Sequence, residues 1–543
     1  MPTQLPRARH GTAVRLALVP LLLAGTAAAA ASDTPSKDTD PWWGHISVLA
    51  SDELQGRLTG SAGYQKAADY VAEGFRRFGL AAAGGQRYFQ TVQYEVQTVL
   101  PERSSVALIR RQGRSVLSVG DDLVLQAGTL QPAEVSGPLV FAGYGIHLPE
   151  VGYDDFAGLP VKGAVVVVLT GGPAQLSGAQ RAHAYAEALP RFLESAGAIG
   201  LISITAPKNR EVPWERIKAA SVQPGMLLEE VALRRYRGAM FTARFNDAAA
   251  AKLFSGSGHT FDELTALADA HQPLPRFALR MDFAGQVAAT HSHTRADNVI
   301  GELPGSDAGL AGQAIVLSAH LDHLGTGKPD HGDGIFHGAM DNASGVASLL
   351  EVARALHDAG LHPRRSVLFV AVAGEEKGLL GSRYFAAHPT RHAGQIVADI
   401  NMDMFLPLYP LKQLVAYGAE ESTLGDDARA VCAQLGLQLV PDPAPDHLIF
   451  VRSDQYNFVR KGIPALMPAI SPRPGAETRI HTAWFSNRYH AQADDLGQPV
   501  DLAAADAFNA FLVKLITRVA DAPDRPQWHS ASFFARFGAN PLP

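Results

Sequence analysis

The sequence predicts an α/β protein with a mixed, mostly parallel main sheet, together with a separate β-rich module. From residue 298 to about residue 404, apolar runs typical of buried strands alternate with amphipathic helical segments. Between about residues 100 and 283, short β-branched runs are instead separated by turn residues. With 543 residues, of which 47% are hydrophobic and 18% charged, the chain can bury more than one core.

The beginning of the chain predicts export. Arg7, Arg9 and Arg15 precede an apolar segment at 16–24 and an Ala-rich stretch with several A-x-A sites, a pattern typical of a cleavable signal peptide over residues 1–31. The apolar segment is short and interrupted by Pro20, so we expect no stable membrane insertion. The mature protein is therefore predicted to be periplasmic or secreted.

Composition excludes several kinds of partner and site. The formal net charge of -6, without any basic run, argues against a nucleic-acid partner. Cys432 is the only cysteine, which excludes an intrachain disulfide and a thiolate-rich metal site. Any metal ligands must therefore be His, Asp or Glu. The sequence leaves the oligomeric state open.

The elements follow in order along the chain. Val71, Phe75 and Phe78 recur at helical spacing, which predicts an amphipathic helix that ends near Gly79. In the β-rich module, strands are expected within residues 138–146, 161–173 and 197–205. In the α/β part, strands are expected at 298–303, 314–322, 366–374 and 395–404, with a helix from about Ser344 to 360.

Chemistry-bearing side chains follow these strands, at the edge where ligand sites of open α/β sheets lie. The run AIVLSA leads into His320 and Asp322, which project to the same side because they are two residues apart. One can bind a metal while the other orients it, since a metal-bound histidine usually donates its second N–H to a carboxylate. Taken alone, the pair is more simply interpreted as a surface histidine beside an acid.

Two further acids lie where an unpaired charge would be costly. Asp341 precedes the predicted helix in HGAMDNASG, where Gly338 and Gly345 let the backbone pass close to a bound ion. Its two carboxylate oxygens can bridge two cations, although an isolated acid here would be interpreted as a helix cap. Asp403 lies near the end of an apolar strand, which favours pairing or metal binding.

Glu375 and Glu376 end another apolar strand, where something positive is expected. Each of two divalent ions would have three protein ligands: one histidine, one carboxylate of its own and one carboxylate shared with the other ion. Each ion would then keep an open position, as in catalytic zinc sites. Asp341, Asp403, Glu376 and a bridging hydroxide would balance two Zn2+. Glu375 would then be free to take a proton from the bridging water. The residues alone do not choose between His481 and His490 as the second histidine.

Five motifs occur in a fixed order: SAHLDHLG, GAMDNASG, AGEEKGLLGS, NMDM and YHAQADDL. Together they resemble the co-catalytic di-zinc exopeptidases that include bacterial leucyl aminopeptidase, aminopeptidase Y and glutamate carboxypeptidase II. The block between the two matching parts resembles the protease-associated (PA) domain inserted in many members. The resemblance implies a three-layer, phosphorylase/hydrolase-like catalytic domain over residues 41–96 and 293–522, a PA domain over 97–288 and a C-terminal tail over 523–543.

The resemblance also implies a role for each candidate residue. Carried over position by position, it assigns His320 and Asp403 to one zinc, Glu376 and His490 to the other, Asp341 as the bridge, Asp322 as the residue that orients His320, and Glu375 as general base and then acid. It further implies that the peptide bond between Asp341 and Asn342 is cis.

These observations predict an exported zinc-dependent aminopeptidase that hydrolyses N-terminal residues from peptides through a hydroxide bridging two zinc ions. A carboxypeptidase or dipeptidase on the same scaffold would need a cation for the terminal carboxylate, for which the candidates are Arg452, Arg460, Lys461 and Arg488. The scaffold also permits a single-zinc cyclase of N-terminal glutamine, against which the complete second metal set argues. A binding module with a dead site, like the related domain of the transferrin receptor, would have lost ligands that this sequence keeps.

Overall fold

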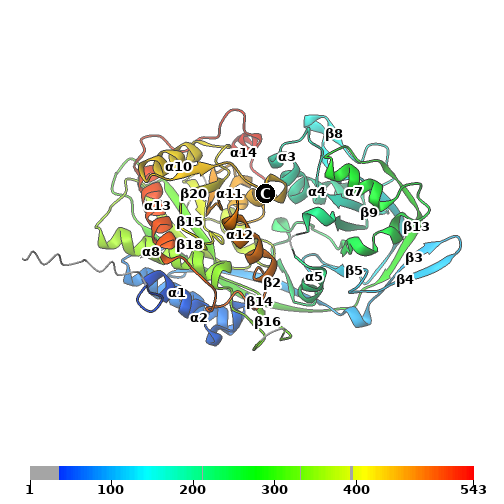
Figure 1. Cartoon of the computed structure of the whole chain (residues 1–543), viewed down its shortest axis with the longest axis horizontal. Helices are drawn as coiled ribbons and strands as arrows, with labels where there is room; N and C mark the ends of the chain where they lie inside the picture. Colours follow the sequence, from blue (N-terminus) through cyan, green and yellow to red (C-terminus); the bar gives the residue numbers. More distant parts are fainter. Residues whose placement is uncertain (1–35, 211, 330–331, 392–394, 543) are drawn as a thin grey trace, which may run out of the picture. The chain divides into compact units, whose positions relative to one another are not determined.

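The computed structural model describes residues 36–210, 212–329, 332–391 and 395–542 (Figure 1). The predicted signal peptide at 1–31 lies outside these residues. Within the described part of the chain, no helix combines the length and the apolar character needed to cross a membrane.

A 10-stranded mixed sheet forms the main structural layer, which confirms the predicted α/β class. Its central strands are parallel, whereas the long β14 runs antiparallel to β18 and carries the segment predicted as a strand at 298–303. The strands are, in spatial order, β11 (Gly225–Leu228), β2 (Phe89–Val99), β14 (Ala289–Leu303), β18 (Ser366–Val372), β15 (Ala314–His320), β19 (Ile396–Asn401), β22 (Ala465–Ile470), β20 (Gln413–Tyr417) and β21 (Gln438–Val440), with β1 (Ala81–Ala82) beside β14.

The register of the parallel strands brings three strand ends together. His320 at the end of β15 is paired with Val372 at the end of β18. On its other side, Ser318 of β15 is paired with Asn401 at the end of β19. The segments that follow β15, β18 and β19 therefore leave the sheet at one edge, as expected for a ligand site of an α/β fold.

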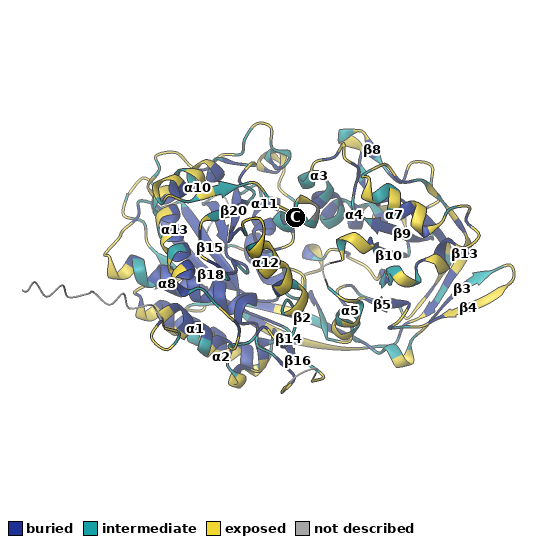
Figure 2. Ribbon diagram, in the orientation of Figure 1, coloured by how far each residue is buried: buried dark blue, intermediate teal, exposed yellow. Residues whose placement is uncertain are grey.

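Helices cover both faces of this sheet, and the alternation of side chains along β18 explains why. Val367 and Phe369 belong to the core on one face, whereas Leu368 and Val370 belong to the core on the other. Both faces of β15 and β18 are accordingly buried (Figure 2). The first face packs against α1 (Pro41–Leu49), α2 (Ala62–Arg77), α8 (Ser344–Asp358), α10 (Thr423–Gln434) and α13 (Leu502–Asp521), and the second against α9 (Leu380–Ala387) and α11 (Gln455–Arg460).

An 8-stranded sheet is built from residues 105–286, within the block 97–288 that we call the second-sheet block. It is less purely β than predicted. Strands β6, β9, β10 and β12 are parallel, and parallel neighbours need crossover connections, which helices such as α3 and α4 supply. The elements are β3 (Ser105–Arg110), β4 (Gly113–Leu117), β5 (Leu123–Leu125), β6 (Glu134–Ala142), β9 (Val165–Thr170), α3 (Gly178–His183), α4 (Leu189–Ala196), β10 (Gly200–Thr205), α5 (Trp214–Ser221), β12 (Phe241–Phe245), α6 (Ala251–Phe254), α7 (Phe261–Asp269) and β13 (Arg276–Gln286).

The second-sheet block and the C-terminal tail both join the main sheet. Strand β11 comes from within the block but pairs with β2 at the edge of the main sheet. In the tail, Phe534 and Phe537 are buried in the same core as Phe458 of α11. The indole of Trp528 donates a hydrogen bond to the carbonyl of Gly462 at 2.9 Å. The tail therefore covers the side of the main sheet on which α11 lies.

Trp42 of α1 provides a test of this packing. Its side chain is 1% exposed, and its indole N–H lies 3.1 Å from both the Ser344 carbonyl and the Ser348 hydroxyl of α8. We expect Trp42→Ala to lower the free energy of unfolding by about 3–5 kcal/mol, because it leaves a cavity and removes both hydrogen bonds. Denaturant unfolding followed by circular dichroism measures this. The control Val116→Ala, at a side chain that is 73% exposed, should change the free energy of unfolding by less than about 0.5 kcal/mol. Equal effects of the two substitutions would contradict the packing of Trp42 against α8.

Candidate metal centre

Five of the residues predicted as metal ligands converge beyond the ends of the central strands. His320 Nε2 lies 3.3 Å from Asp341 Oδ1 and 3.3 Å from Asp403 Oδ1. His490 Nε2 lies 3.3 Å from Asp341 Oδ2 and 3.3 Å from Glu376 Oε2. The two oxygens of Asp341 thus face two different histidines, and each histidine faces one further acid.

These distances fit two neighbouring zinc positions. With zinc–nitrogen and zinc–oxygen bonds of about 2.0–2.1 Å, the edge of a tetrahedron of donors is about 3.3–3.4 Å long. All four donor separations have this length. Asp341 Oδ2 is also buried and has no hydrogen-bond partner among the described residues. An oxygen in that situation is costly unless a cation compensates it.

The loop before α8 is shaped to present Asp341. Gly338 has a φ of 60°, and a Cβ at this position would lie 2.2 Å from the Asp341 carbonyl oxygen. The carboxylate of Asp494 accepts hydrogen bonds from the backbone N–H groups of Met340 at 3.0 Å and Asp341 at 2.9 Å. The peptide bond between Asp341 and Asn342 is cis, so this prediction from the family resemblance is confirmed.

Asp322 contacts His320 differently from the prediction. His320 Nδ1 lies 3.1 Å from the backbone carbonyl of Asp322, whereas the Asp322 carboxylate is 4.0 Å away. That carboxylate instead accepts hydrogen bonds from the Thr59 hydroxyl at 2.8 Å and from the Glu375 N–H at 3.1 Å. The main chain turns at the strand end, so the carbonyl meets the imidazole and the carboxylate meets Glu375. Asp322 therefore links both residues, although not through the predicted carboxylate contact.

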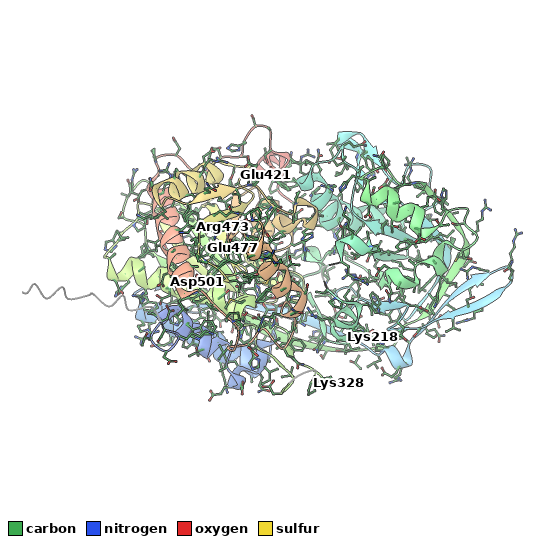
Figure 3. All side chains as sticks on the ribbon, in the orientation of Figure 1. Lys218, Lys328, Glu421, Arg473, Glu477 and Asp501 are labelled. Carbon is green, nitrogen blue, oxygen red and sulfur yellow. The ribbon has the colours of Figure 1, made fainter. Side chains whose placement is uncertain are left out.

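The structure separates the two candidates for the second histidine. His481 lies in α12 (Ala476–Asn487), and its Nδ1 is 3.2 Å from the Tyr409 hydroxyl. Burial lowers the pKa of His481 to about 4. His490, in contrast, lies beside Asp341 and Glu376. The start of α12 is held by Arg473, whose N–H and guanidinium both bond to Glu477 (Figure 3).

Sequence reasoning missed two residues that support the centre. His323 is buried, and its Nδ1 lies 2.7 Å from Glu376 Oε1, so it forms a third possible ligand group with Asp341 and Glu376. Arg57 is also buried and donates to the carbonyls of Leu321, at 3.0 Å, and Gly338, at 3.1 Å. The second histidine in HLDH could have indicated His323, but Arg57 carries no comparable local signal.

The neighbouring acids Glu375 and Glu376 differ in electrostatic surroundings. Burial, with the charges of Asp403 and Glu376, raises the pKa of Glu375 well above its usual range. Burial also acts to raise the pKa of Glu376, but His490 and His323 more than offset this and lower it. Glu376 is therefore held as an anion, while Glu375 is suited to carry a proton. Divergent pKa values of this kind distinguish a proton-transfer group from a charged partner.

Comparison with known proteins gives a family match for the segment that carries these residues. Residues 298–516 match the sequence profile of peptidase family M28. We call this matching segment the M28 domain. The match confirms the predicted family resemblance, and it includes every residue that we place at the two zinc positions.

Two relatives of known name match parts of the chain. The chain is 28% identical over 190 residues to leupeptin-inactivating enzyme 1 of Streptomyces exfoliatus, covering 34% of this chain and 39% of the relative. It is 29% identical over 123 residues to carboxypeptidase Q of Xenopus laevis, covering 22% and 24% of the two chains. These matches span about two fifths or less of the relatives' own length.

A solved structure has a similar fold over most of the chain. The aminopeptidase from Aneurinibacillus sp. strain AM-1 has a TM-score of 0.52 at 18% sequence identity, covering 89% of this chain and 94% of that chain. At this identity the likeness concerns the fold alone.

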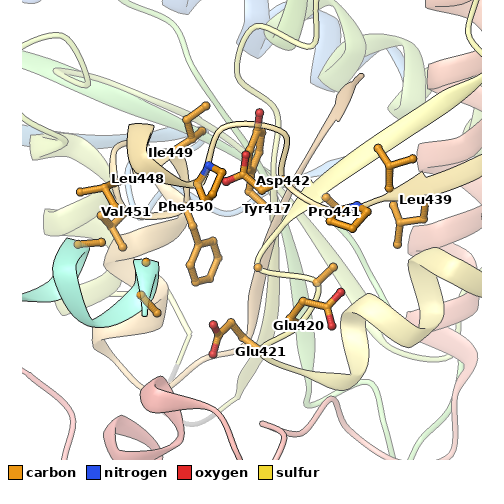
Figure 4. A pocket seen from close by; sticks show the side chains of 18 of the residues that line it. Tyr417, Glu420, Glu421, Leu439, Pro441, Asp442, Leu448, Ile449, Phe450 and Val451 are labelled. Carbon is orange, nitrogen blue, oxygen red and sulfur yellow. The ribbon is translucent and has the colours of Figure 1, made fainter. Parts of the chain in front are cut away.

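A cavity of about 630 Å³ opens beside the predicted metal ligand His490. His490, Tyr489 and Lys377 contribute to its lining, together with residues of the second-sheet block. Another cavity, of about 380 Å³, is lined by Tyr417, Glu420 and Asp442 among others, and by none of the predicted site residues (Figure 4). The larger cavity is therefore the one that a substrate of the metal centre would enter.

Arg216 connects the second-sheet block to the loop that carries His490. From α5, its guanidinium donates to the carbonyls of Tyr489, at 2.6 Å, and Ser486, at 2.7 Å. We expect Arg216→Gln to weaken zinc binding about tenfold, because supporting contacts of this kind orient the ligand. Zinc titration against a chelating indicator measures it. Arg210→Gln, which removes an ion pair to Asp247 in the same block, serves as control. Equal zinc affinities for both variants would contradict this role.

Proposed function

We propose that the chain is a zinc-dependent aminopeptidase with two zinc ions per chain. His320 and Asp403 would bind one ion, His490 and Glu376 the other, and Asp341 would bridge them. The observation that carries this proposal is the pair of Asp341 oxygens, each 3.3 Å from a different histidine. Such a shared carboxylate has no evident purpose in a site for a single ion.

When bound, zinc supplies a Lewis acid that polarises the peptide carbonyl and lowers the pKa of an attacking water. Glu375 is the group that would take the proton of that water and pass it to the leaving amine. Its raised pKa suits it to hold a proton between these two steps. The hydrogen bond from its N–H to Asp322 keeps it at the end of β18, beside His320.

Three parts of the proposal extend beyond the metal centre. The N-terminal pattern at 1–31 supports export to the periplasm or the medium. The second-sheet block has a hydrophobic core of its own, which supports its interpretation as an inserted PA domain over 97–288. The remaining segments, 41–96 and 293–522, would form the catalytic domain.

A carboxypeptidase is the second candidate, and the names of the relatives include both kinds of exopeptidase. Of the cations considered for a terminal carboxylate, Arg460 is bound to Glu187 at 2.8 Å, and Arg488 donates to the Ala493 carbonyl. Arg452 contributes to the cavity beside His490. We favour the aminopeptidase because the acids of the metal centre can attract a free amine, whereas Arg460 and Arg488 are engaged by Glu187 and by the Ala493 carbonyl.

Replacing each of the adjacent glutamates separates their proposed roles. Glu375→Gln should lower kcat by about 100-fold or more while zinc content stays near two per chain, because it removes the proton carrier and no ligand. Glu376→Gln should lower zinc content as well. Zinc measured by atomic absorption, alongside peptide hydrolysis, tests both statements. Loss of zinc in Glu375→Gln with retention in Glu376→Gln would reverse the assignment, and an inactive zinc-loaded wild type would favour a binding module.

A set of three tripeptides identifies the end that is cleaved. The free tripeptide should release its N-terminal residue, the N-acetylated peptide should be resistant, and the C-terminal amide should still be cleaved. An aminopeptidase needs the free amine but not the carboxylate. Products are identified by mass spectrometry. Release of the C-terminal residue from the acetylated peptide would establish the carboxypeptidase instead.

A further inference from the structure

Cationic side chains dominate the 630 Å³ cavity beside His490, which we call the arginine-lined cavity. Four of its cations come from the second-sheet block and three from the M28 domain, whereas Glu187 is the one carboxylate among the described residues of the lining. The seven cations are Arg181, Arg234, Arg235, Arg244, Lys377, Arg383 and Arg452. A concave surface lined by one sign of charge concentrates ligands of the opposite sign.

Two of these cations have acidic partners: Arg234 lies 3.0 Å from Glu95, and Arg383 pairs with Glu187, the carboxylate of the lining. Glu187 lies 3.3 Å from Arg383, 2.8 Å from Arg460 and 3.2 Å from Arg191. Burial and the neighbouring charge of Arg460 lower the pKa of Arg383 to about 9. The lining therefore holds seven cationic side chains and one carboxylate, and that carboxylate is shared among three arginines.

Two of the cations are well placed to meet a ligand. Arg235 lies over the ring of Tyr185 at 5.5 Å and donates to the Tyr185 carbonyl at 2.8 Å, which fixes one part of a guanidinium that has five N–H donors. Lys377 follows Glu376 directly and makes no hydrogen bond or ion pair with any described residue. The positive lining therefore begins beside the metal ligands and extends into the second-sheet block.

We propose that the arginine-lined cavity binds a carboxylate of the peptide substrate, located beyond the residue that is cleaved. The proposal rests on the proposed exopeptidase function and defines its substrate class as short anionic peptides. Arginine suits this task because its planar fork matches a carboxylate. A cavity of about 630 Å³ has the size of a pocket for a small ligand, so it accommodates a short peptide and no folded chain.

The carboxylate could belong to the C-terminus of the peptide or to an acidic side chain, and four tripeptides distinguish these sources. They are Leu-Ala-Ala as free acid, its C-terminal amide, and the amides of Leu-Ala-Glu and Leu-Ala-Lys. With zinc-loaded wild-type protein, we expect kcat/KM to be about tenfold higher for the free acid than for its amide, as for a charged hydrogen bond. The Glu amide should recover part of this difference, and the Lys amide should be the poorest substrate.

The double variant Arg235→Gln, Arg452→Gln tests the cavity itself. Both side chains are exposed, so folding should be preserved. Arg235 belongs to the second-sheet block and Arg452 to the M28 domain. The ratio of kcat/KM between the free acid and the amide should fall about fivefold or more, because exposed ion pairs are weak singly but add across two sites. Arg114→Gln, an exposed arginine of β4 outside the cavity, should leave the ratio unchanged.

A binding measurement keeps this proposal separate from the proposed function. Calorimetry on zinc-loaded Glu375→Gln should show tighter binding of the free acid than of the amide, and the double variant should remove that difference. If no tripeptide is cleaved but the binding difference is present, the exopeptidase assignment fails while the cavity assignment stands. If acid and amide are equal in both rate and binding, or if the double variant leaves their ratio unchanged, the cavity assignment is overturned.

Discussion

Mutual repulsion among buried carboxylates is the constraint on which the site depends. Asp322, Asp341 and Asp403 are each at most 4% exposed, and Glu375 and Glu376 enter the same space from the end of β18. Such a cluster is unfavourable unless positive charge compensates it. The histidines supply part of that charge: although burial alone would lower the pKa of His320, Asp403 and Glu375 raise it well above its usual value. Two divalent ions would supply the rest.

Much of the surrounding structure holds this cluster in place. The buried Arg57 ties the N-terminal segment to the loops after β15 and before α8 through backbone carbonyls. Asp494, near the other end of the chain, accepts hydrogen bonds from the backbone N–H groups of Met340 and Asp341 in the loop before α8. Segments separated by more than 400 residues therefore meet at the loop that carries Asp341. This is how a site made of loops gains the rigidity that metal binding requires.

The second-sheet block lines part of the cavity beside the metal centre and supplies positive side chains to it, whereas the proposed ligands come from the M28 domain. Strand β11 extends the main sheet, Arg216 contacts the loop of His490, and four arginines of the block line the cavity that leads to the metal centre. In the proposed function the ligands come from the M28 domain alone, whereas the cavity beside them is lined by both parts of the chain. The lining residues can vary without disturbing the ligands.

The local sequence determined the elements and the donor chemistry, because these depend on neighbours along the chain. Helical spacing predicted the helix observed as α2, and apolar runs predicted β15, β18 and β19 with their terminal acids and histidines. The single cysteine restricted metal ligands to oxygen and nitrogen. The helices of the second-sheet block were underestimated, since short segments such as α3 and α4 are specified by the need to cross between parallel strands.

Only the tertiary structure decided which of these groups meet. Local pattern could not choose between His481 and His490, because the choice depends on which histidine a distant loop brings to Asp341. It could not indicate Arg57, which donates to the nearby Leu49 carbonyl but also to carbonyls of residues more than 260 positions away. The arginines of the second-sheet block, separately unremarkable along the chain, become one positive cavity only after folding. Electrostatic fields depend on distance in space, and sequence separation does not report that distance.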